Sequence, residues 1–467
     1  MKNWNQLFVR HGWLIEDKGE NTFDCSKETD VNLTFLMECL NKAKVDYRYI
    51  APLKELTIFT EITEEEWLKI LNFNHRGRGG HLWFRPGQDQ PKVRELDTFI
   101  CGIVRQLNRL GFYTTGSCDG HERRPAHLIL TDKCQIETLV EILHTLGQKQ
   151  VSWRENRNGS YHLRLPFKRK QLLYLAEQLS SVEEEWVEEG YDFIKEKLFQ
   201  QQLEQLLSIP GESGNEEPIR KHVLEKLSPF VDFITVDQAG NILAEKTYKG
   251  GYGPTILLNA HLDTVYEIEK DREIIKEGNL WSSSKGILGA DDRAGVAVLL
   301  HVAEFLHFTN SFRGKVKFIF TVEEECGLVG ASKVHDYFLW GTDAAIVVDR
   351  RGTGDIVTSC GGYIPFCNVS YGEFFEKLAE EAELNGWATT IGGSSDTRIW
   401  AEHGIQSVNL SAGYNHEHTE REVLDVASCY ETAKLVKAVL GKGNELKRVL
   451  RDIRRGKQVE EVTGTLL

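Results

Sequence analysis

The segment KVKFIFTVEEE, residues 315–325, decides the fold class of this chain. An apolar run with few interruptions is typical of a strand buried on both faces, and here it leads directly into three glutamates. TILLNAHLD (255–263) and AAIVVDR (344–350) have the same form, an apolar run that ends on charged residues. Strands of this kind belong to sheets covered by helices on both sides.

Helical patterns near 293–308 and 374–385 separate or follow these strands. We therefore predict an α/β domain over 196–445, with a mostly parallel sheet flanked by helices. In such sheets, sites gather at the carboxyl ends of the strands. Five polar clusters lie at strand ends or beside glycine turns: AHLD (260–263), GADDRAG (289–295), TVEEECG (321–327), VVDR (347–350) and HEHTE (416–420).

Length and composition set the domain count. The chain has 467 residues, of which 41% are hydrophobic and 27% charged, so more than one packed core is expected. Residues 1–195 are predicted to form a separate α+β domain of unknown role, either as one body or as subdomains at 1–90 and 91–180. Residues 446–467 are predicted to be a basic C-terminal tail.

Charge and cysteine usage restrict the partners and the compartment. The formal net charge of -14 disfavours nonspecific binding to nucleic acid or a membrane surface. No apolar stretch reaches the ~18 residues of a membrane span, and the start of the chain lacks the apolar region of a signal peptide. The nine cysteines show no disulfide or zinc-ribbon spacing. We expect a cytoplasmic protein with reduced thiols, and its oligomeric state stays open.

Each polar cluster allows a chemical and a structural interpretation. On a strand, Asp263 points to the same side as His261 and could orient its ring, although a structural pair fits as well. Asp291 and Asp292 open a helix, where two carboxylates repel unless a cation or the helix N-terminus stabilises them.

Among the three glutamates of the third cluster, one could bind a metal while its neighbour acts as a base. A lone strand-end aspartate such as Asp349 is often a loop cap, and His416 and His418 could be ordinary surface residues. Five structural explanations holding at once in one domain are improbable, so the clusters together predict a metal site.

The ordered clusters resemble the co-catalytic zinc exopeptidase superfamily, most nearly peptidase T-like and related aminopeptidases, over about residues 200–440. The resemblance implies two divalent ions, Zn²⁺ or else Mn²⁺ or Co²⁺, bridged by Asp291, and a cis peptide after that residue. It favours His418 over His416 as the last ligand. The implied site residues are the metal ligands His261, Asp291, Glu325, Asp349 and His418 and the catalytic residues Glu324 and Asp263.

The function that this resemblance implies is a metal-dependent exopeptidase, with an aminopeptidase as the first choice. A water shared by two ions would attack the peptide bond of a peptide or small amide substrate, with Glu324 as general base. Peptidase T inserts a lid domain where only 42 residues separate Asp349 from Gly392 here, so we expect no lid. The alternatives are a di-zinc amidohydrolase acting on N-acyl or non-peptide amides and an inactive hydrolase fold that serves as a binding protein.

Three further segments have unassigned roles. Ser394, Ser395, Asp396 and Thr397 are candidate substrate contacts or ordinary turn residues. RGRGGHLWFRPG (76–87) mixes basic and aromatic residues, which suits either an anion, a nucleic-acid strand or a peptide, or a solvated loop. In GSCDGHERR (116–124), Cys118 and His121 could form half of a metal site. No second pair follows at a matching spacing, so a structural turn is expected.

Overall fold

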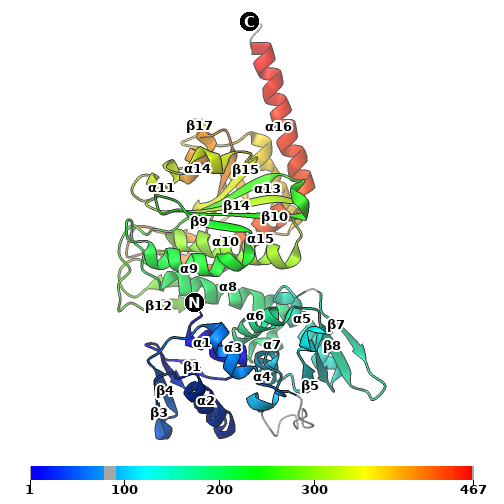
Figure 1. Cartoon of the computed structure of the whole chain (residues 1–467). Helices are drawn as coiled ribbons and strands as arrows, with labels where there is room; N and C mark the ends of the chain where they lie inside the picture. The colour runs from blue at the N-terminus through cyan, green and yellow to red at the C-terminus, as the bar shows by residue number, and fades with distance from the viewer. Residues whose placement is uncertain (1, 78–90, 149, 465–467) are drawn as a thin grey trace. The chain divides into compact units, whose positions relative to one another are not determined.

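The computed structural model describes residues 2–77, 91–148 and 150–464, with side chains up to residue 456. The chain forms two compact units, Met1–Leu198 and Phe199–Leu467 (Figure 1). The basic and aromatic segment predicted to start at Arg76 lies mostly outside the described residues.

The first unit contains two four-stranded antiparallel sheets, with the orders β1-β2-β4-β3 and β5-β6-β8-β7. One hydrophobic cluster, from Trp4 to Ile194, packs both sheets and their helices. The strands are β1 (Glu16–Asp17), β2 (Thr22–Asp24), β3 (Tyr47–Ile50), β4 (Glu55–Ile58), β5 (Thr114–Cys118), β6 (Ala126–Leu130), β7 (Ser152–Glu155) and β8 (Tyr161–Leu165). The helices are α1 (Trp4–His11), α2 (Asp30–Lys42), α3 (Glu64–Leu71), α4 (Cys101–Arg109), α5 (Lys133–Thr145), α6 (Arg169–Ser180) and α7 (Trp186–Glu189), and α8 (Tyr191–Leu207) begins in this unit and ends in the second.

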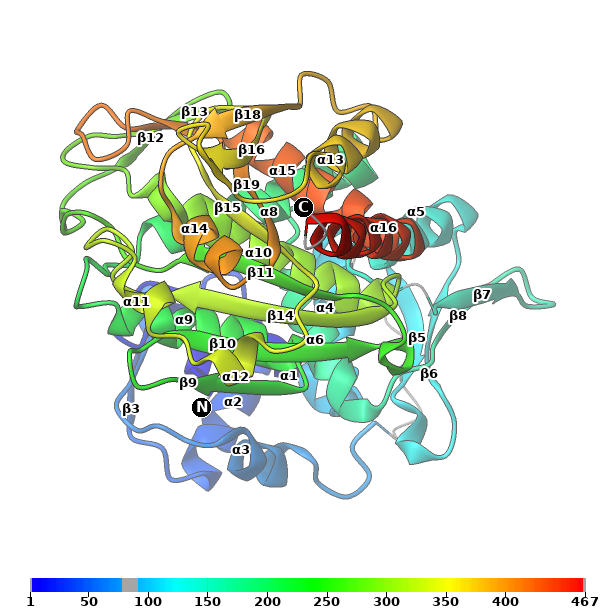
Figure 2. The same ribbon diagram turned by 90° about the horizontal axis from the view of Figure 1, so that it is seen from above.

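A nine-stranded sheet forms the centre of the second unit (Figure 2). Its order is β17-β16-β19-β15-β11-β14-β10-β9, and β18 pairs with β16. The strands are β9 (Phe233–Val236), β10 (Ile242–Tyr248), β11 (Thr255–His261), β14 (Gly314–Thr321), β15 (Ala344–Arg350), β16 (Asp355–Cys360), β17 (Ile364–Pro365), β18 (Ala388–Gly392) and β19 (Gln406–Ser411).

The expected parallel arrangement holds for the centre of this sheet, where β14, β11, β15 and β19 run side by side in one direction. The flanks differ, because β10 pairs antiparallel with both β14 and β9, and β16 pairs antiparallel with β19. Strands β9 and β10 form a hairpin whose turn is held by the Asp237 carboxylate, which accepts the backbone N–H groups of Ala239, Gly240 and Asn241. The hairpin makes β9 and β10 antiparallel to each other. Together with the β10–β14 and β16–β19 pairs, it makes the sheet mixed rather than mostly parallel.

Helices cover both faces of this sheet. The buried helix α10 (Ala290–Thr309) packs on β11 and β15, with α9 (Glu217–Leu227) and α15 (Val426–Gly441) beside it. The opposite face carries α11 (Val329–Ser332), α12 (Asp336–Leu339) and α14 (Asp396–Glu402), where Trp400 and Leu339 pack against Leu257 and Val347. Because both faces are covered, the central strands are apolar throughout, as the sequence pattern indicated.

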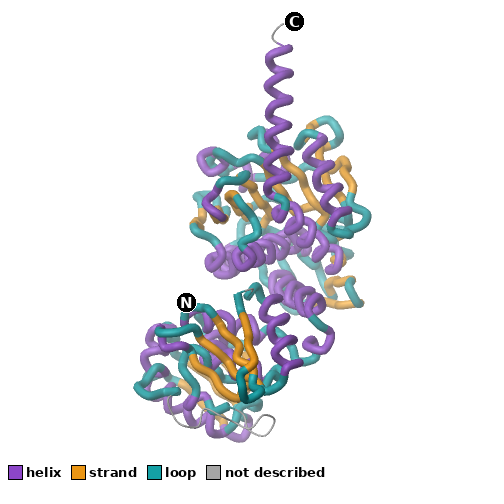
Figure 3. Tube along the Cα trace, turned by 90° about the vertical axis from the view of Figure 1, so that its right-hand side faces the viewer, coloured by secondary structure: helices purple, strands orange, loops and turns teal. Residues whose placement is uncertain are grey.

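The residues between Asp349 and Gly392 form β16, β17, α13 (Val369–Glu381) and β18, and their strands extend the main sheet. A small second sheet has the order β12-β13-β21-β20, with β12 at Ile274–Glu277, β13 at Leu280–Ser283, β20 at Tyr414–Asn415 and β21 at Val423–Asp425. The last helix, α16 (Gly443–Gly464), projects from its unit (Figure 3). Among the described helices, none is both long and apolar enough to cross a membrane.

Candidate metal centre

His261, the last residue of the central strand β11, is 1% exposed and is held by the next residues of the chain. Its Nδ1 lies 3.3 Å from Asp263 Oδ1, and its Nε2 points to Asp291 Oδ1 at 3.1 Å. Burial alone would lower the pKa of His261, but hydrogen bonds with Asp263, Asp291 and Asp349 raise it well above its ordinary value. The carboxylates around the ring therefore favour a positive charge at this position.

Asp291 lies in the first turn of α10, and the peptide bond between it and Asp292 is cis, as the resemblance implied. The two aspartates have different environments. Asp291 faces His261 with one oxygen and lies 3.1 Å from His418 Nε2 with the other. Asp292 is fully buried and accepts the backbone N–H groups of His261 and Gly295, at 3.2 and 3.0 Å. Asp292 thus fixes the start of α10 against β11.

Two groups of potential metal ligands share Asp291. The first contains His261, Asp291 and Asp349, and the second contains Asp291, Glu325 and His418. Within each group, one ligand atom per residue lies within 4.8 Å of the others. The five residues implied as ligands by the sequence are therefore brought together, from β11, α10, β15 and two loops. His416 is in neither group among the described residues.

Asp349 is held by residues that sequence reasoning missed. Tyr414 donates its hydroxyl to Asp349 Oδ1 at 2.9 Å, and Asn409 bonds both the N–H and the C=O of Asp349. Glu422 was also missed. This buried residue accepts the N–H groups of Gly289 and Asp291 at 2.7 and 3.0 Å. The only sequence signal was that Glu422 lies four residues after the candidate ligand His418.

The loop after β14 carries Glu324 and Glu325, and Asp263 fixes its backbone. The two oxygens of Asp263 accept the N–H of Glu324 at 3.0 Å and that of Glu325 at 3.1 Å, and Ser213 donates its hydroxyl at 2.7 Å. Burial would raise the pKa of Asp263, but its bond with His261 and these donors lower it to about 2. Asp263 therefore joins the His261 ring to the glutamate loop.

Few positive charges lie near the carboxyl groups of Glu324 and Glu325, and their pKa values are raised. Burial, with the neighbouring carboxylates of Asp349 and Asp396, raises the pKa of Glu324 to about 10, although His261 opposes this. Burial likewise raises the pKa of Glu325 to about 7. The hydrogen bond with Asp291 raises the pKa of His418 to about 9.

These residues fit divalent cations. Glu325 Oε1 is buried and lies 2.8 Å from His418 Nε2, yet it has no hydrogen bond of acceptable geometry among the described residues. Burial also raises the pKa of Asp349. Buried carboxylates without enough countercharge are stabilised by metal ions, and mixed imidazole and carboxylate donors suit Zn²⁺.

The segment at 394–397 divides into one exposed and three buried residues. Ser394 is exposed. Ser395 caps α14 through the N–H of Thr397, and Asp396 accepts a hydrogen bond from Thr321. The other oxygen of Asp396 has no hydrogen-bond partner among the described residues, and burial raises the pKa of this residue to about 7.

The region that contains these residues is similar to a known peptidase family. Residues 241–441 match the model of peptidase family M28. The resemblance to zinc exopeptidases is confirmed for this region.

Three curated relatives show how far the similarity extends. YqjE of Bacillus subtilis, an uncharacterised protein, is 27% identical over 228 residues, which cover 47% of this chain and 56% of that protein. The cytosol non-specific dipeptidase of Escherichia coli is 30% identical over 172 residues, covering 34% of this chain and 35% of the dipeptidase. Peptidase T of Clostridium botulinum is 27% identical over 157 residues, covering 31% and 37%. The chain thus spans about half or less of these relatives.

Proposed function

We propose that this protein is a metal-dependent exopeptidase, and specifically an aminopeptidase, whose site lies at the carboxyl end of the central strands. The observation that carries the proposal is the pair of ligand groups that share Asp291. The family match over 241–441 and the similarity to a dipeptidase and to peptidase T support the same reaction class.

The residues divide into four roles in this proposal. His261 and Asp349 would hold one ion, Glu325 and His418 would hold the other, and Asp291 would serve both, because it belongs to both ligand groups. Two divalent ions, when bound, supply Lewis acidity and lower the pKa of water toward neutrality. Asp263 keeps the glutamate loop in place by accepting the N–H groups of Glu324 and Glu325 at 3.0 and 3.1 Å, and its carboxylate lies 3.3 Å from the His261 ring.

Glu324 is the proposed general base. Its backbone is anchored by Asp263, and the charges that act on its carboxyl group after burial are those of His261, Asp349, Asp396 and Glu325. The carboxyl group is therefore next to the ligands without being in either ligand group among the described residues. It would accept the proton of the attacking water and pass it to the leaving amine. Nearby cations would lower its pKa from the raised value and keep it ionised.

The variant Glu324→Gln tests this role. It should keep the metal content of the parent and lose hydrolysis of aminoacyl substrates by about 10²–10⁴-fold, because general base catalysis is removed. Glu323→Gln, which changes the adjacent half-buried glutamate, is the matched control and should retain turnover. Parent-like activity in Glu324→Gln would refute the assignment.

A substrate panel decides between peptides and other amides. Aminoacyl anilides, dipeptides and N-acyl amino acids should be offered to the metal-loaded protein. Preferential cleavage of substrates with a free amino group supports an aminopeptidase. Preferential cleavage of the N-acyl amino acids would instead identify an amidohydrolase with the same ligands.

A further inference from the structure

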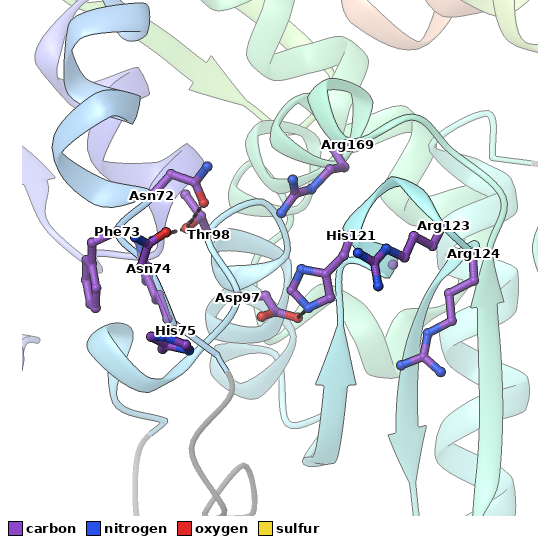
Figure 4. A pocket seen from close by; sticks show the side chains of 12 residues that line it. Asn72, Phe73, Asn74, His75, Asp97, Thr98, His121, Arg123, Arg124 and Arg169 are labelled. Atoms are coloured by element: carbon purple, nitrogen blue, oxygen red, sulfur yellow. Dashed lines mark hydrogen bonds and ion pairs between the residues drawn. The ribbon is translucent and has the colours of Figure 1, made fainter.

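The first unit contains a separate group of potential metal ligands, Asp97, Cys118 and His121. Asp97 precedes α4, Cys118 ends β5, and His121 lies in the turn that follows β5. One ligand atom from each lies within 4.8 Å of the others. Figure 4 shows Asp97 and His121 facing each other, with Oδ2 and Nε2 3.5 Å apart. The sequence left Cys118 and His121 without a partner, and Asp97 now supplies it.

Asp97 is 3% exposed and is not fully satisfied by the protein. Its Oδ2 accepts the backbone N–H of Asp119 at 3.1 Å. Its Oδ1 is buried and has no hydrogen-bond partner within the described part of the chain. Oδ1 lies against Gly77 and Oδ2 faces the His121 ring, so an ion would be held through Oδ2 and would offset the negative charge of a buried carboxylate that the described residues leave partly unpaired.

A second carboxylate orients the His121 ring. Nδ1 of His121 lies 3.4 Å from Asp119 Oδ1, while the other oxygen of Asp119 is held by Arg169, with Nε at 3.1 Å. Asp119 Oδ1 also accepts the backbone N–H of His121 at 2.9 Å, so the ring lies with Nδ1 toward Asp119 and Nε2 toward Asp97, where an ion could bind. This carboxylate–histidine pairing is the usual outer support of a histidine that binds a metal.

The position of the Cys118 sulfur is also fixed. The side chain is 8% exposed, and its Sγ accepts the backbone N–H of Gly120 at 3.4 Å and an Arg124 guanidinium N–H at 3.5 Å. The described residues form no disulfide here, since Cys118 is a free cysteine. One thiolate, one imidazole and one carboxylate form a donor set that suits Zn²⁺.

A cavity of about 700 Å³ opens beside this group and is lined by Asp97 and His121. Arg123, Arg124 and Arg169 line it as well (Figure 4). Asp119 forms an ion pair with Arg169, and a Cys118 thiolate with Asp97 would neutralise a divalent ion. The positive charges of Arg123, of Arg124 beside the Cys118 sulfur and of the buried Arg76 would then attract an anion into the cavity. Guanidinium groups are well suited to oxyanions.

We propose that Asp97, Cys118 and His121 bind one Zn²⁺ ion and that its open fourth position, facing the cavity, takes an anionic oxygen ligand. Three protein ligands and one open position are typical of zinc sites that exchange a ligand. The Cys118 thiol would release its proton when the ion binds. This site shares no residue with the proposed exopeptidase centre, because all its residues lie in the first unit.

Cobalt substitution of the full chain tests the site by a signal that the exopeptidase centre would not give. Thiolate ligation of Co²⁺ produces a charge-transfer band in the near ultraviolet, and none of the five proposed exopeptidase ligands is a cysteine. The parent should show this band. Cys118→Ser should lose it, and the zinc content should fall by one equivalent per chain. Cys134→Ser, which changes an exposed cysteine of the same unit, is the matched control and should keep both.

His121→Asn is a second variant in case Cys118→Ser does not fold, since the His121 side chain is 32% exposed. It should also lose the zinc equivalent, with aminopeptidase activity retained. Absence of the band in the parent, or a band that persists in Cys118→Ser and disappears in Cys326→Ser, would overturn the proposal. In that case Asp97, His121, Asp119 and Arg169 form a structural ion-pair network only.

Inorganic phosphate is the probe for the open position. Phosphate should shift the charge-transfer band of the cobalt-loaded parent, and Arg123→Gln should keep the band while requiring at least tenfold more phosphate for the same shift. A band that does not respond to phosphate would refute the anionic ligand.

Discussion

Replacing Asp263 by asparagine changes a carboxylate that contacts both the glutamate loop and the His261 ring. The Asp263 carboxylate accepts the N–H of Glu324 on Oδ1 and the N–H of Glu325 on Oδ2, and it also lies beside the His261 ring. An asparagine keeps one oxygen and replaces the other by an NH₂ group. In either orientation, one backbone N–H of the glutamate loop faces a donor instead of an acceptor.

The size of the effect follows from that loss. A hydrogen bond to a charged group contributes about 1.5–3 kcal/mol, and about 1.4 kcal/mol corresponds to a factor of ten. Asp263→Asn should therefore reduce the product of metal affinity and turnover by about 10- to 150-fold. KM should change little, because Asp263 is fully buried and cannot contact a substrate.

Metal affinity measured by competition with a chelator, together with kcat and KM at saturating metal, checks this prediction. Asp336→Asn, an exposed aspartate of α12, is the control and should behave like the parent. Metal affinity and kcat both within twofold of the parent in Asp263→Asn would refute the role of Asp263 as the link between His261 and the glutamate loop.

Three further predictions follow from individual contacts. Tyr414→Phe removes the 2.9 Å bond to Asp349 and should weaken metal binding about tenfold, and an unchanged chelator titration would contradict this. Gly295→Ala places a Cβ 2.0 Å from the Val348 carbonyl oxygen and should destabilise the second unit by about 3 kcal/mol, whereas Gly441→Ala, in open space, should not; equal melting temperatures would contradict it. Burial would raise the pKa of Glu64, but the nearby His11 ring and the hydrogen bonds from Arg10 lower it to about 2. Its contribution of about 3 kcal/mol is therefore present above about pH 4.5 and is lost as the pH falls toward 2. Glu64→Gln should abolish that acid sensitivity, measured by hydrogen exchange in α1 and α3.

The central part of the fold could be predicted because it depends on local pattern. The strands β11, β14 and β15 are continuous apolar runs, and α10 begins within the GADDRAG motif, so their type and order are readable from the chain. The antiparallel flanks and the small sheet of β12, β13, β20 and β21 were not predicted. Strand β13 pairs with β21, about 140 residues later, and no local pattern specifies such a partner.

The candidate ligands could be predicted because they occur in recognisable clusters, while their supporting residues occur singly. Ser213, Asn409 and Tyr414 are ordinary polar residues in the sequence and acquire a role only when the fold places them against Asp263 and Asp349. Asp97 is a similar case. An aspartate just before a helix is typical of a cap, and its position beside Cys118 and His121 depends on the packing of α4 against β5.

Anomalous X-ray diffraction from crystals of the zinc-loaded protein tests the two-metal site directly. Two zinc peaks are expected in the second unit on either side of the Asp291 carboxylate, one bound by His261 and Asp349 and the other by Glu325 and His418. A single peak, or peaks bound by other residues of this unit, would contradict this assignment.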